Sequence, residues 1–328
     1  MAFMTKSFVI GSLAVLGAAS AAPALAQQQL TATGASFPAP MFQQWFEELK
    51  QNDGPVVDYT AVNSVDGIRQ LIDLEVDFGA TDRPIAPTTA EKVKRGLIQI
   101  PVVGGAVAVG YNKKDCDLKL TQTQLTKVFL GEISDWKQLG CNEGPIKVIT
   151  RSDASGTTLA FTKSLSSWDK SFNDKIGSGM LVSWPIGTSA ESTEGVTDSL
   201  RTTKGSLGYV NVPAIKGVIK AAAIENKSGN FMQPNSATGI AAIESIKEAG
   251  LTPESINNPP GRDAYPIVAM SWLQAFETGN GEEAEAIRKT FKFMLSDPAQ
   301  SQADNLGYVP LPEKLQQAAL ADVENIKK

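Results

Sequence analysis

The ten residues from Ile149 to Thr158 place several kinds of hydrogen-bond donor in one short stretch. Arg151 offers a guanidinium fork, and Ser155 and Thr157 offer hydroxyl groups. Gly156 lets the backbone approach a ligand closely. Because only an anion needs so many converging donors, the stretch indicates an anion-binding site.

This stretch is expected to be a turn between a strand and a helix. An apolar run at 146–149 precedes it, and apolar residues at helical spacing follow at Leu159, Phe161 and Leu165. The first N–H groups of such a helix point at one place, with the positive end of the helix dipole behind them. Asp153 would then either hold the arginine or accept a proton from the ligand. The same residues also make a good N-cap for an ordinary helix, and this alternative stays open.

Three earlier turns have the same polar, small-residue character. We expect strands at Leu30–Thr33, Val56–Val62 and Val76–Ala80, alternating with helices in an α/β arrangement. Because the carboxyl ends of parallel strands face one crevice in an open sheet, these turns should lie close together. Each turn taken alone is also a good N-cap. The candidate residues in the three turns are Ser36, Phe37, Ser64 and Asp82.

The rest of the pattern predicts two lobes. The apolar segment 97–111 is longer than a usual strand, and its Pro101 and paired glycines indicate a bend where the chain passes between lobes. The apolar run 264–273 should be a strand that returns to the first lobe. Two further helices are expected, one at 88–95 and one with Ile68, Leu71 and Ile72 facing inward.

The composition excludes several functional classes. The absence of histidine from all 328 residues removes Ser-His-Asp and Cys-His catalysis and histidine metal sites. Thirty Lys and Arg against thirty-five Asp and Glu, without a basic block, argue against a nucleic-acid partner. The chain has no Gly-x-Ser-x-Gly elbow and no grouped acidic set that would indicate a hydrolase. We therefore expect a binding protein with no enzyme activity, no metal and no cofactor.

Residues 1–26 are typical of a signal peptide. Lys6 is their only charged residue, 8–19 is an apolar run, and Ala24-Leu25-Ala26 is a small-x-small cleavage site. The apolar run is short for a membrane span. We therefore expect an exported, free protein that is cleaved after Ala26.

Two cysteines, Cys116 and Cys141, remain in the mature chain. Export permits a disulfide, which would stabilise the fold by about 3–4 kcal/mol in the chain-entropy model. We favour a bridge, and two unpaired thiols are the alternative.

Several blocks of the sequence, in this order, resemble the signature of a known family. That family is the periplasmic phosphate-binding proteins (PstS type) of the high-affinity phosphate ABC transporter. The blocks extend over most of the chain from Leu30 onward. They are Leu30–Pro40, Val76–Asp82, Arg151–Thr157, Trp184–Gly187 and Ser206–Val210.

The resemblance implies a type II periplasmic binding protein, in which two α/β lobes joined by two hinge strands close over one dehydrated phosphate. We expect a first lobe at 27–101 plus 266–328 and a second lobe at 102–265. In that family hydroxyls, N–H groups and an arginine hold the ligand, and one aspartate holds the arginine in place. The residues that match this ligand set are Ser36, Phe37, Ser64, Asp82, Arg151, Asp153, Ser155, Gly156 and Thr157.

The implied function is high-affinity binding of inorganic phosphate in the periplasm, by a monomer that delivers it to an ABC-type phosphate permease. A carboxylate at Asp82 fits this function, because phosphate near neutral pH still carries a proton to donate and sulfate does not. One alternative is a receptor for another oxyanion. A second is a phosphate-sensing or scavenging protein that serves no permease.

Two positions depart from the family pattern. Val65-Asp66-Gly67 stands where the family usually has a small residue or a second serine, and Ala154 stands where glycine is common. Asp66 favours the start of a helix but brings negative charge near an anion, which leaves the environment of Ser64 open.

Overall fold

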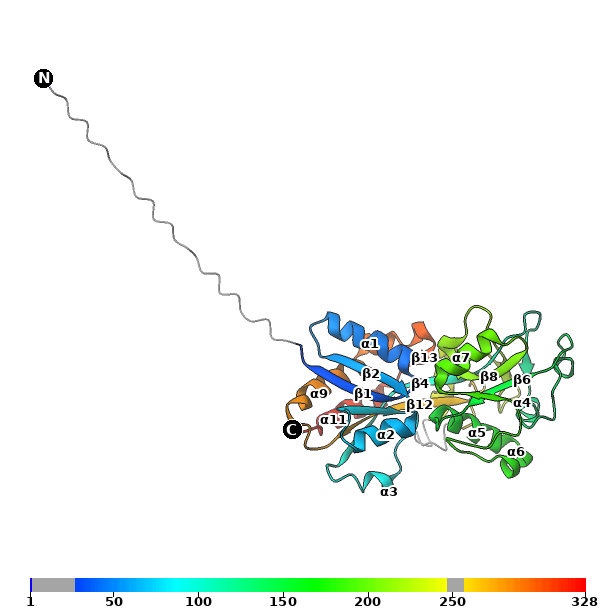
Figure 1. Cartoon of the computed structure of the whole chain (residues 1–328), viewed down its shortest axis with the longest axis horizontal. Helices are drawn as coiled ribbons and strands as arrows, with labels where there is room; N and C mark the ends of the chain where they lie inside the picture. Colours follow the sequence, from blue (N-terminus) through cyan, green and yellow to red (C-terminus); the bar gives the residue numbers. More distant parts are fainter. Residues whose placement is uncertain (2–26, 247–256) are drawn as a thin grey trace.

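The computed structural model of the chain describes residue 1, residues 27–246 and residues 257–328. The expected signal peptide lies outside the described residues, apart from Met1. Two α/β halves lie side by side (Figure 1). The half that contains β1, β2, β3 and the C-terminal helices is called the first lobe, and the half that contains β6, β7 and β8 is called the second lobe.

The first lobe is built on three parallel strands in the order β2-β1-β3. These strands are β1 (Gln29–Ala35), β2 (Val56–Val62) and β3 (Phe78–Thr81). Helix α1 (Ala39–Gln51) follows β1, and α2 (Ser64–Ile72) follows β2. All three strands were expected from the sequence, and their carboxyl ends point towards the second lobe (Figure 1).

Helix α1 shows why this part of the chain folds as it does. Its apolar residues recur every three or four positions, so Phe42, Trp45, Phe46 and Leu49 share one face and are at most 5% exposed. The Trp45 indole also donates to the backbone carbonyl of Ala299 at 2.9 Å. The buried face therefore ties the start of the chain to its C-terminal part.

The second lobe contains a second group of parallel strands in the order β8-β6-β7. These are β6 (Lys147–Arg151), β7 (Thr188–Ala190) and β8 (Ser206–Asn211). Helix α5 (Gly156–Trp168) follows β6, and α7 (Ser192–Thr202) follows β7. Both helices begin at the end of the lobe that faces the first lobe (Figure 1).

Two long antiparallel strands join the lobes into one sheet. They are β4 (Leu97–Tyr111) and β12 (Val268–Phe276). The first part of β4 pairs with β12, and its last five residues pair with β8 of the second lobe. The predicted lobe boundaries, 101/102 and 265/266, lie within β4 and shortly before β12 and stay a prediction.

The expected bend in segment 97–111 takes the form of an irregularity within one continuous strand. Ser271 lies opposite Val103 and Trp272 lies opposite Pro101, so Val102 has no partner residue in the ladder. Such a bulge lets a strand bend locally while the pairing continues on both sides. The proline and the glycines therefore do not end β4.

Some sequence-based expectations differ from the structure in detail. The helix expected at 88–95 is a single turn, α3 (Pro87–Ala90). The strand expected at 264–273 lies a few residues later, as β12. Leu71 is buried as expected, but Ile72, the last residue of α2, is 37% exposed.

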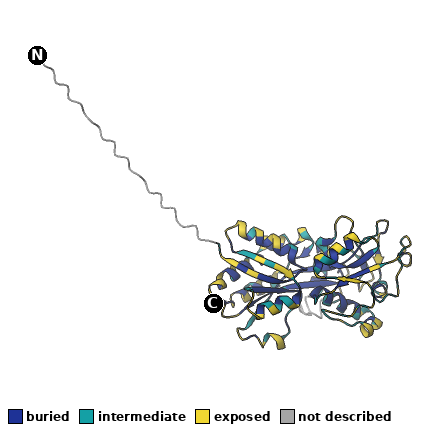
Figure 2. Ribbon diagram, viewed as in Figure 1, coloured by how far each residue is buried: buried dark blue, intermediate teal, exposed yellow. Residues whose placement is uncertain are grey.

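The remaining elements cover the two faces of the sheet and the ends of the lobes, and Figure 2 shows the buried strands between exposed helix faces. No helix within 27–246 or 257–328 is both long and apolar enough to cross a membrane. The remaining elements are β5 (Lys119–Leu120), α4 (Gln122–Phe129), η1 (Trp136–Leu139), α6 (Lys170–Lys175), η2 (Val212–Ala214), β9 (Lys220–Ala221), β10 (Ala223–Glu225), β11 (Phe231–Met232), α8 (Ser236–Ser245), η4 (Gly281–Glu283), α9 (Ala284–Met294), α10 (Asp297–Ser301), η5 (Asp304–Leu306), β13 (Tyr308–Val309) and α11 (Glu313–Val323).

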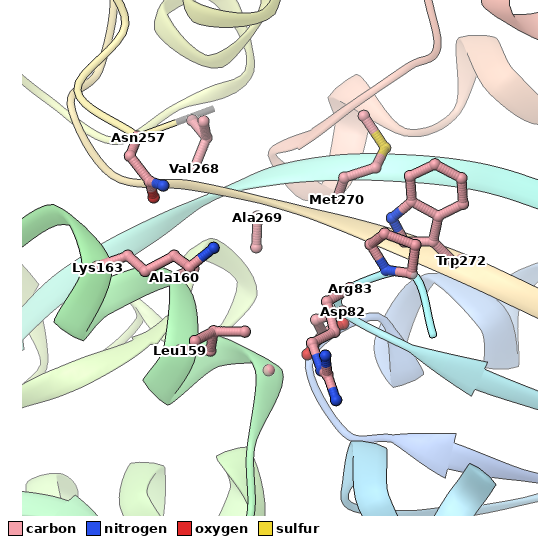
Figure 3. A pocket seen from close by; sticks show the side chains of 12 residues that line it. Asp82, Arg83, Leu159, Ala160, Lys163, Asn257, Val268, Ala269, Met270 and Trp272 are labelled. Carbon is pink, nitrogen blue, oxygen red and sulfur yellow. The ribbon is translucent and has the colours of Figure 1, made fainter. Parts of the chain in front are cut away.

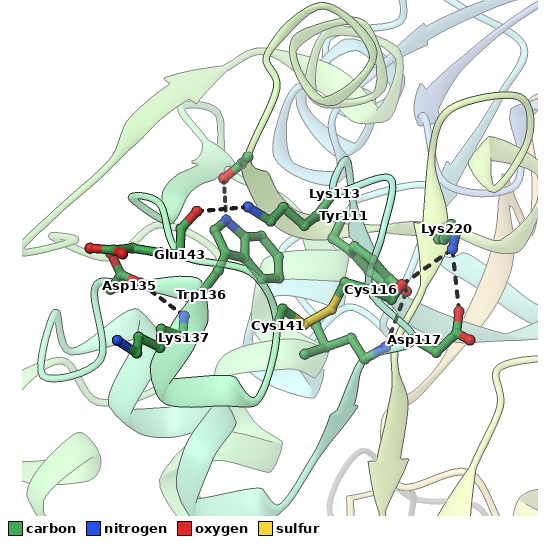
Figure 4. Close-up of a disulfide and its surroundings, with 12 residues drawn as sticks. Tyr111, Lys113, Cys116, Asp117, Asp135, Trp136, Lys137, Cys141, Glu143 and Lys220 are labelled. Carbon is green, nitrogen blue, oxygen red and sulfur yellow. Dashed lines mark hydrogen bonds and ion pairs between the residues drawn. A yellow bond between two sulfur atoms is a disulfide. The ribbon is translucent and has the colours of Figure 1, made fainter.

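The two cysteines form a disulfide in the second lobe (Figure 4). Cys116 and Cys141 are 25 residues apart in sequence, and their Cα atoms are 5.4 Å apart. The favoured alternative of a bridge is therefore confirmed. The disulfide links the segment that follows β4 to the loop that follows η1.

Candidate functional site

The hydroxyl of Ser64 brings two lobes and three turns together. Ser64 is the first residue of α2, whose N-cap is Asn63, and it is 1% exposed. Its Oγ accepts the backbone N–H of Asp82 at 3.3 Å and that of Gly156 at 3.3 Å. Asp82 follows β3 of the first lobe, whereas Gly156 begins α5 of the second lobe. The ends of β2 and β3 therefore meet the N-terminus of α5.

The carboxylate of Asp82 lies at this junction and accepts two hydroxyl donors. Ser271, on β12, donates to Oδ1 at 2.8 Å, and Thr157, in the first turn of α5, donates to Oδ2 at 3.3 Å. Asp82 is only 7% exposed, and its burial raises its pKa from 3.8 to about 6. The hydroxyl donors and the positive charge of Arg151 oppose this shift in pKa. Asp82 is therefore a buried acid that is still charged near neutral pH.

Arg151 supplies the positive charge of the site. It is the last residue of β6 and is 3% exposed. Its Nε donates to Asp153 Oδ1 at 2.6 Å, and its Nη2 forms a second bond to Oδ2 of the same carboxylate. Such a two-point contact fixes the plane of the guanidinium group. Of the two roles considered for Asp153, this geometry supports the one in which Asp153 holds the arginine.

The N-terminus of α5 is shaped by its cap and by its first residue. Ser155 is the N-cap, and its Oγ accepts the N–H groups of Thr157 at 3.1 Å and Thr158 at 3.4 Å. Gly156 lies against the first lobe, where an added Cβ would be 2.6 Å from the Cβ of Asp82 and 3.0 Å from Ser64 Oγ. No larger residue fits there without moving the lobes apart.

Ser36 and Phe37 extend the same junction along the end of β1. The Ser36 hydroxyl accepts the N–H of Thr193 at 2.9 Å and donates to its Oγ1 at 3.1 Å. The Phe37 carbonyl accepts from Tyr308 at 2.6 Å and from Asn211 at 2.9 Å. Because Thr193 lies in the first turn of α7, a second helix N-terminus of the second lobe faces the first lobe here.

Comparisons with known proteins identify the family. A model of the PBP superfamily domain matches residues 19–298. The phosphate-binding protein PstS of Xylella fastidiosa (strain Temecula1) is 33% identical over 306 residues, which cover 88% of this chain and 82% of that protein. The chain belongs to the PstS family of phosphate-binding proteins. Its relative in Haemophilus influenzae, also a phosphate-binding protein PstS, is 31% identical and covers 94% of each chain.

Solved structures of phosphate-binding proteins are similar to this chain in fold. A phosphate-binding protein from Stenotrophomonas maltophilia has a TM-score of 0.73 at 19% identity, covering 90% of this chain and 94% of that one. A high-affinity periplasmic phosphate-binding protein, PfluDING, solved with bound phosphate, has a TM-score of 0.72 at 19% identity, with coverage of 90% and 93%. The chain therefore has the type II periplasmic binding protein fold.

The nine residues that sequence analysis selected lie around one junction between the lobes of this PstS family member. Asp153 connects the residues around Arg151 with the Ser36–Thr193 contact. Its Oδ1 also accepts the N–H of Ser192 at 3.2 Å, and Ser192 precedes Thr193 in the chain. The departure at 65–67 leaves this junction intact. Asp66 accepts from Asn63 at 2.6 Å and pairs with Arg69, and an added Cβ at Gly67 would be 2.5 Å from the Cα of Gly34.

Two residues at the junction were not selected from the sequence. Thr193 lies in the Ser/Thr/Gly-rich segment 187–195, and its position just after β7 repeats the strand–turn–helix pattern of the selected turns. That pattern could have identified it. Ser271 is a single hydroxyl residue in the apolar strand β12, and it is fully buried. A buried hydroxyl in an apolar strand needs a partner, and the partner is Asp82.

Two cavities border the junction. Figure 3 shows one, in which Asp82 and Arg83 of the first lobe lie across from Leu159 and Lys163 of α5. The other is lined by residues of both lobes, including Ser36 and Thr193. In the described part of the chain, no three Cys, Asp or Glu side chains gather as metal ligands would. Hydroxyls, N–H groups, the Arg151–Asp153 pair and the buried acid Asp82 supply the polar groups of the junction.

Proposed function

We propose that this chain binds inorganic phosphate between its lobes and delivers it to the membrane permease of an ABC-type phosphate transporter. We assign the lobes to 27–101 with 266–328 and to 102–265. Membership of the PstS family supports the proposal, as does the set of converging donors from both lobes. The ligand residues are Ser36, Phe37, Ser64, Asp82, Arg151, Asp153, Ser155, Gly156 and Thr157, with Asp153 acting through the arginine.

The observation that carries the proposal is the buried carboxylate of Asp82 among donors. With a pKa of about 6, it is mostly ionised at pH 7 and can accept a hydrogen bond. Hydrogen phosphate has a proton to donate to this acceptor. Sulfate has no such proton, and its negative charge would be repelled by the carboxylate. Each donor to a charged ligand contributes roughly 1.5–3 kcal/mol, so the set supports tight binding after the costs of desolvation and closure.

Calorimetric titration of the Asp82→Asn variant tests this assignment. We expect phosphate affinity to fall at least about tenfold, because one charge-assisted hydrogen bond is lost, and the preference over sulfate to shrink. The matched control is Asp66→Asn, which removes a half-exposed carboxylate close to Ser64 without removing the acceptor. Unchanged selectivity in Asp82→Asn would contradict the assignment.

A different oxyanion is the main rival ligand. A fully deprotonated ion such as sulfate or molybdate should be held by neutral donors only, and the charged Asp82 disfavours it. Titration of the native protein with each ion separates these ligands. A mass spectrum of gently purified protein, with one retained phosphate per chain, would support phosphate directly.

Coupling to a permease is a separate part of the proposal. A sensing or scavenging protein could use the same ligand residues without serving a transporter. Cells that lack this chain should take up radiolabelled phosphate more slowly at low external concentration, and the native gene should restore uptake. Restoration of sensing without restoration of uptake would favour the rival. An assay with phosphate esters should find no hydrolysis, since we propose a binding protein and no enzyme.

We further propose that the protein acts in the periplasm as a monomer, after cleavage between Ala26 and Gln27. The phosphate-binding protein of similar fold that is described as periplasmic supports the compartment. The mass of the exported protein tests the cleavage site, and light scattering on the mature chain tests the monomer. Nucleic acid should not bind, because the chain carries a formal charge of −5.

A further inference from the structure

The far end of the second lobe contains a cavity of about 710 Å³ that the proposed function does not use. It lies at the start of β6 and β8 and at the end of β4, where Lys147, Gly205 and Asn112 line it. Arg151, at the other end of β6, is four residues away from Lys147, or roughly 13 Å along the strand. The cavity is therefore separate from the junction between the lobes.

Positive charge is concentrated in this cavity. Among the described residues, Asp115 is the only acidic one that lines it, although the whole chain carries a formal charge of −5. No arginine of the described segments lines it, so the charge is carried by flexible ammonium groups rather than by planar forks. Five lysines line it, from four separate segments of the chain: Lys113, Lys114, Lys147, Lys204 and Lys220.

Most of this charge has no carboxylate partner. Lys220 pairs with Asp117 at 3.2 Å, and Lys113 donates to the backbone carbonyl of Glu143 at 3.2 Å (Figure 4). For Lys114, Lys147 and Lys204 the described part of the chain offers no ion pair. Because like charges that share a cavity repel one another, a bound anion would stabilise this arrangement.

The cavity is left open by glycines in conformations that other residues rarely adopt. Gly144, Gly205 and Gly217 line it and have φ angles of +143°, +76° and +64°. At Gly217 an added Cβ would meet no atom within 4 Å, so the wall there faces open space. Side chains therefore do not fill the hollow between the lysines.

The walls of the cavity are tied to one another. The buried Trp136 lines it and donates from its indole to the carbonyl of Gly205 at 3.1 Å, which connects η1 to the start of β8. The Cys116–Cys141 disulfide joins the segment after β4 to the loop after η1 (Figure 4). The backbone that carries the lysines is therefore held in place before any ligand arrives, which lowers the entropic cost of binding.

We propose that this cavity binds a small, multiply charged anion of the linear polyphosphate class. A single orthophosphate ion can pair with few of these ammonium groups, whereas a chain of a few phosphate units offers anionic oxygens to more of them. The volume is within the range of ordinary small-ligand pockets, which is about 300–1,000 Å³. The proposal does not depend on phosphate binding between the lobes.

Titration of the full mature chain with inorganic tripolyphosphate tests the proposal. Saturating orthophosphate is present throughout, so that any anion site between the lobes is occupied. We expect one tripolyphosphate per chain, with affinity that falls as salt concentration rises. The double variant Lys147→Gln/Lys204→Gln should bind it about tenfold or more weakly, because two of five cationic groups are lost. Its orthophosphate affinity and its thermal unfolding should stay unchanged.

The matched control is Lys92→Gln/Lys314→Gln, which removes two exposed lysines of the first lobe and changes the net charge equally. This control should bind tripolyphosphate as the native chain does. The proposal is overturned if tripolyphosphate does not bind, or if both double variants bind it equally. It is also overturned if an acidic peptide binds as tightly as tripolyphosphate at these lysines, since the cavity would then be a surface for an acidic protein.

Discussion

The hydroxyl of Ser36 accepts the backbone N–H of Thr193 at 2.9 Å and donates to its hydroxyl at 3.1 Å. Ser36 follows β1 in the first lobe, and Thr193 begins α7 in the second lobe. Both side chains are buried, with 6% exposure each. This pair is therefore a direct connection between the lobes, made by one of the proposed phosphate-binding residues.

Replacing Thr193 by valine should make phosphate leave faster. The substitution keeps the shape of the side chain and the backbone N–H but removes the hydroxyl that accepts from Ser36. We expect this loss to lower the stability of the closed state, relative to the open one, by about 0.5–1.5 kcal/mol. We expect the dissociation rate, measured by stopped flow, to rise about 3–10-fold, with a smaller change in the association rate. Thr197→Val is the control, because the Thr197 hydroxyl donates within α7, to the Thr193 carbonyl at 2.7 Å, and makes no bond to the described part of the first lobe. Equal effects of the two variants would argue against the interlobe role.

Removing the charge of Asp82 should stabilise the phosphate-free protein. Burial raises the pKa of Asp82 from 3.8 to about 6, so the folded protein binds this proton more tightly than the unfolded chain does. The ionised carboxylate therefore lowers the free energy of unfolding. This loss of stability is absent below pH 4, grows between pH 4 and pH 6, and is constant above pH 6. The shift corresponds to about 3 kcal/mol.

We therefore expect Asp82→Asn to raise the free energy of unfolding by up to about 3 kcal/mol at pH 7 and by much less at pH 4. Urea unfolding of phosphate-free protein across this pH range measures the difference. Asp66→Asn serves as the control, because its half-exposed carboxylate is largely solvated. A difference that shrinks as the pH rises from 4 to 6 would have the wrong sign for a buried charge.

Replacing Gly156 by alanine should block closure while leaving each lobe folded. The added methyl would be 2.6 Å from the Cβ of Asp82, across the junction. Alanine itself suits the first turn of a helix, so the free energy of unfolding should change by less than about 1 kcal/mol. We expect phosphate affinity to fall at least about 100-fold, or roughly 3 kcal/mol.

Small-angle scattering gives a second measurement on this variant, because contraction on adding phosphate should be lost. Gly195→Ala is the control: it lies in α7, and its added Cβ would have ordinary contacts, the nearest at 3.5 Å. If Gly156→Ala bound phosphate like the native chain, the close approach at Gly156 would not be required for closure.

The disulfide should stabilise the second lobe without contributing to phosphate binding. Removing a bridge between residues 25 positions apart costs about 3–4 kcal/mol in the chain-entropy model. We expect Cys116→Ser/Cys141→Ser to lower the free energy of unfolding by that amount and to change phosphate affinity less than about threefold, since the bridge lies far from the junction. Reductant should destabilise the native protein and have no effect on the double variant. A large loss of affinity would show that the bridge positions the ligand residues.

The sequence predicted the local structure of the proposed site well. The periodicity of α1 and the short apolar runs at 56–62 and 146–149 specify helix and strands through nearest-neighbour preferences alone. Serine and glycine in the turns follow from the needs of helix caps and close approach, which are also local. Prediction failed for the length of α3 and for the exposure of Ile72, because both depend on how much of each helix packs against the sheet. That depends on packing between segments far apart in the chain.

The sequence by itself determined which residues could bind an anion, because donor chemistry and helix caps are properties of short stretches. It also determined that an acid, Asp82, accompanies them. Only the tertiary structure decided that Ser64 meets Gly156, that Ser36 meets Thr193, and that Ser271 reaches Asp82. These pairs are 92, 157 and 189 residues apart in sequence. The first two contacts arise only when β4 and β12 bring both lobes against one another, and the third arises because β12 pairs with β3 inside the first lobe. The desolvation that shifts the pKa of Asp82 depends on the same packing.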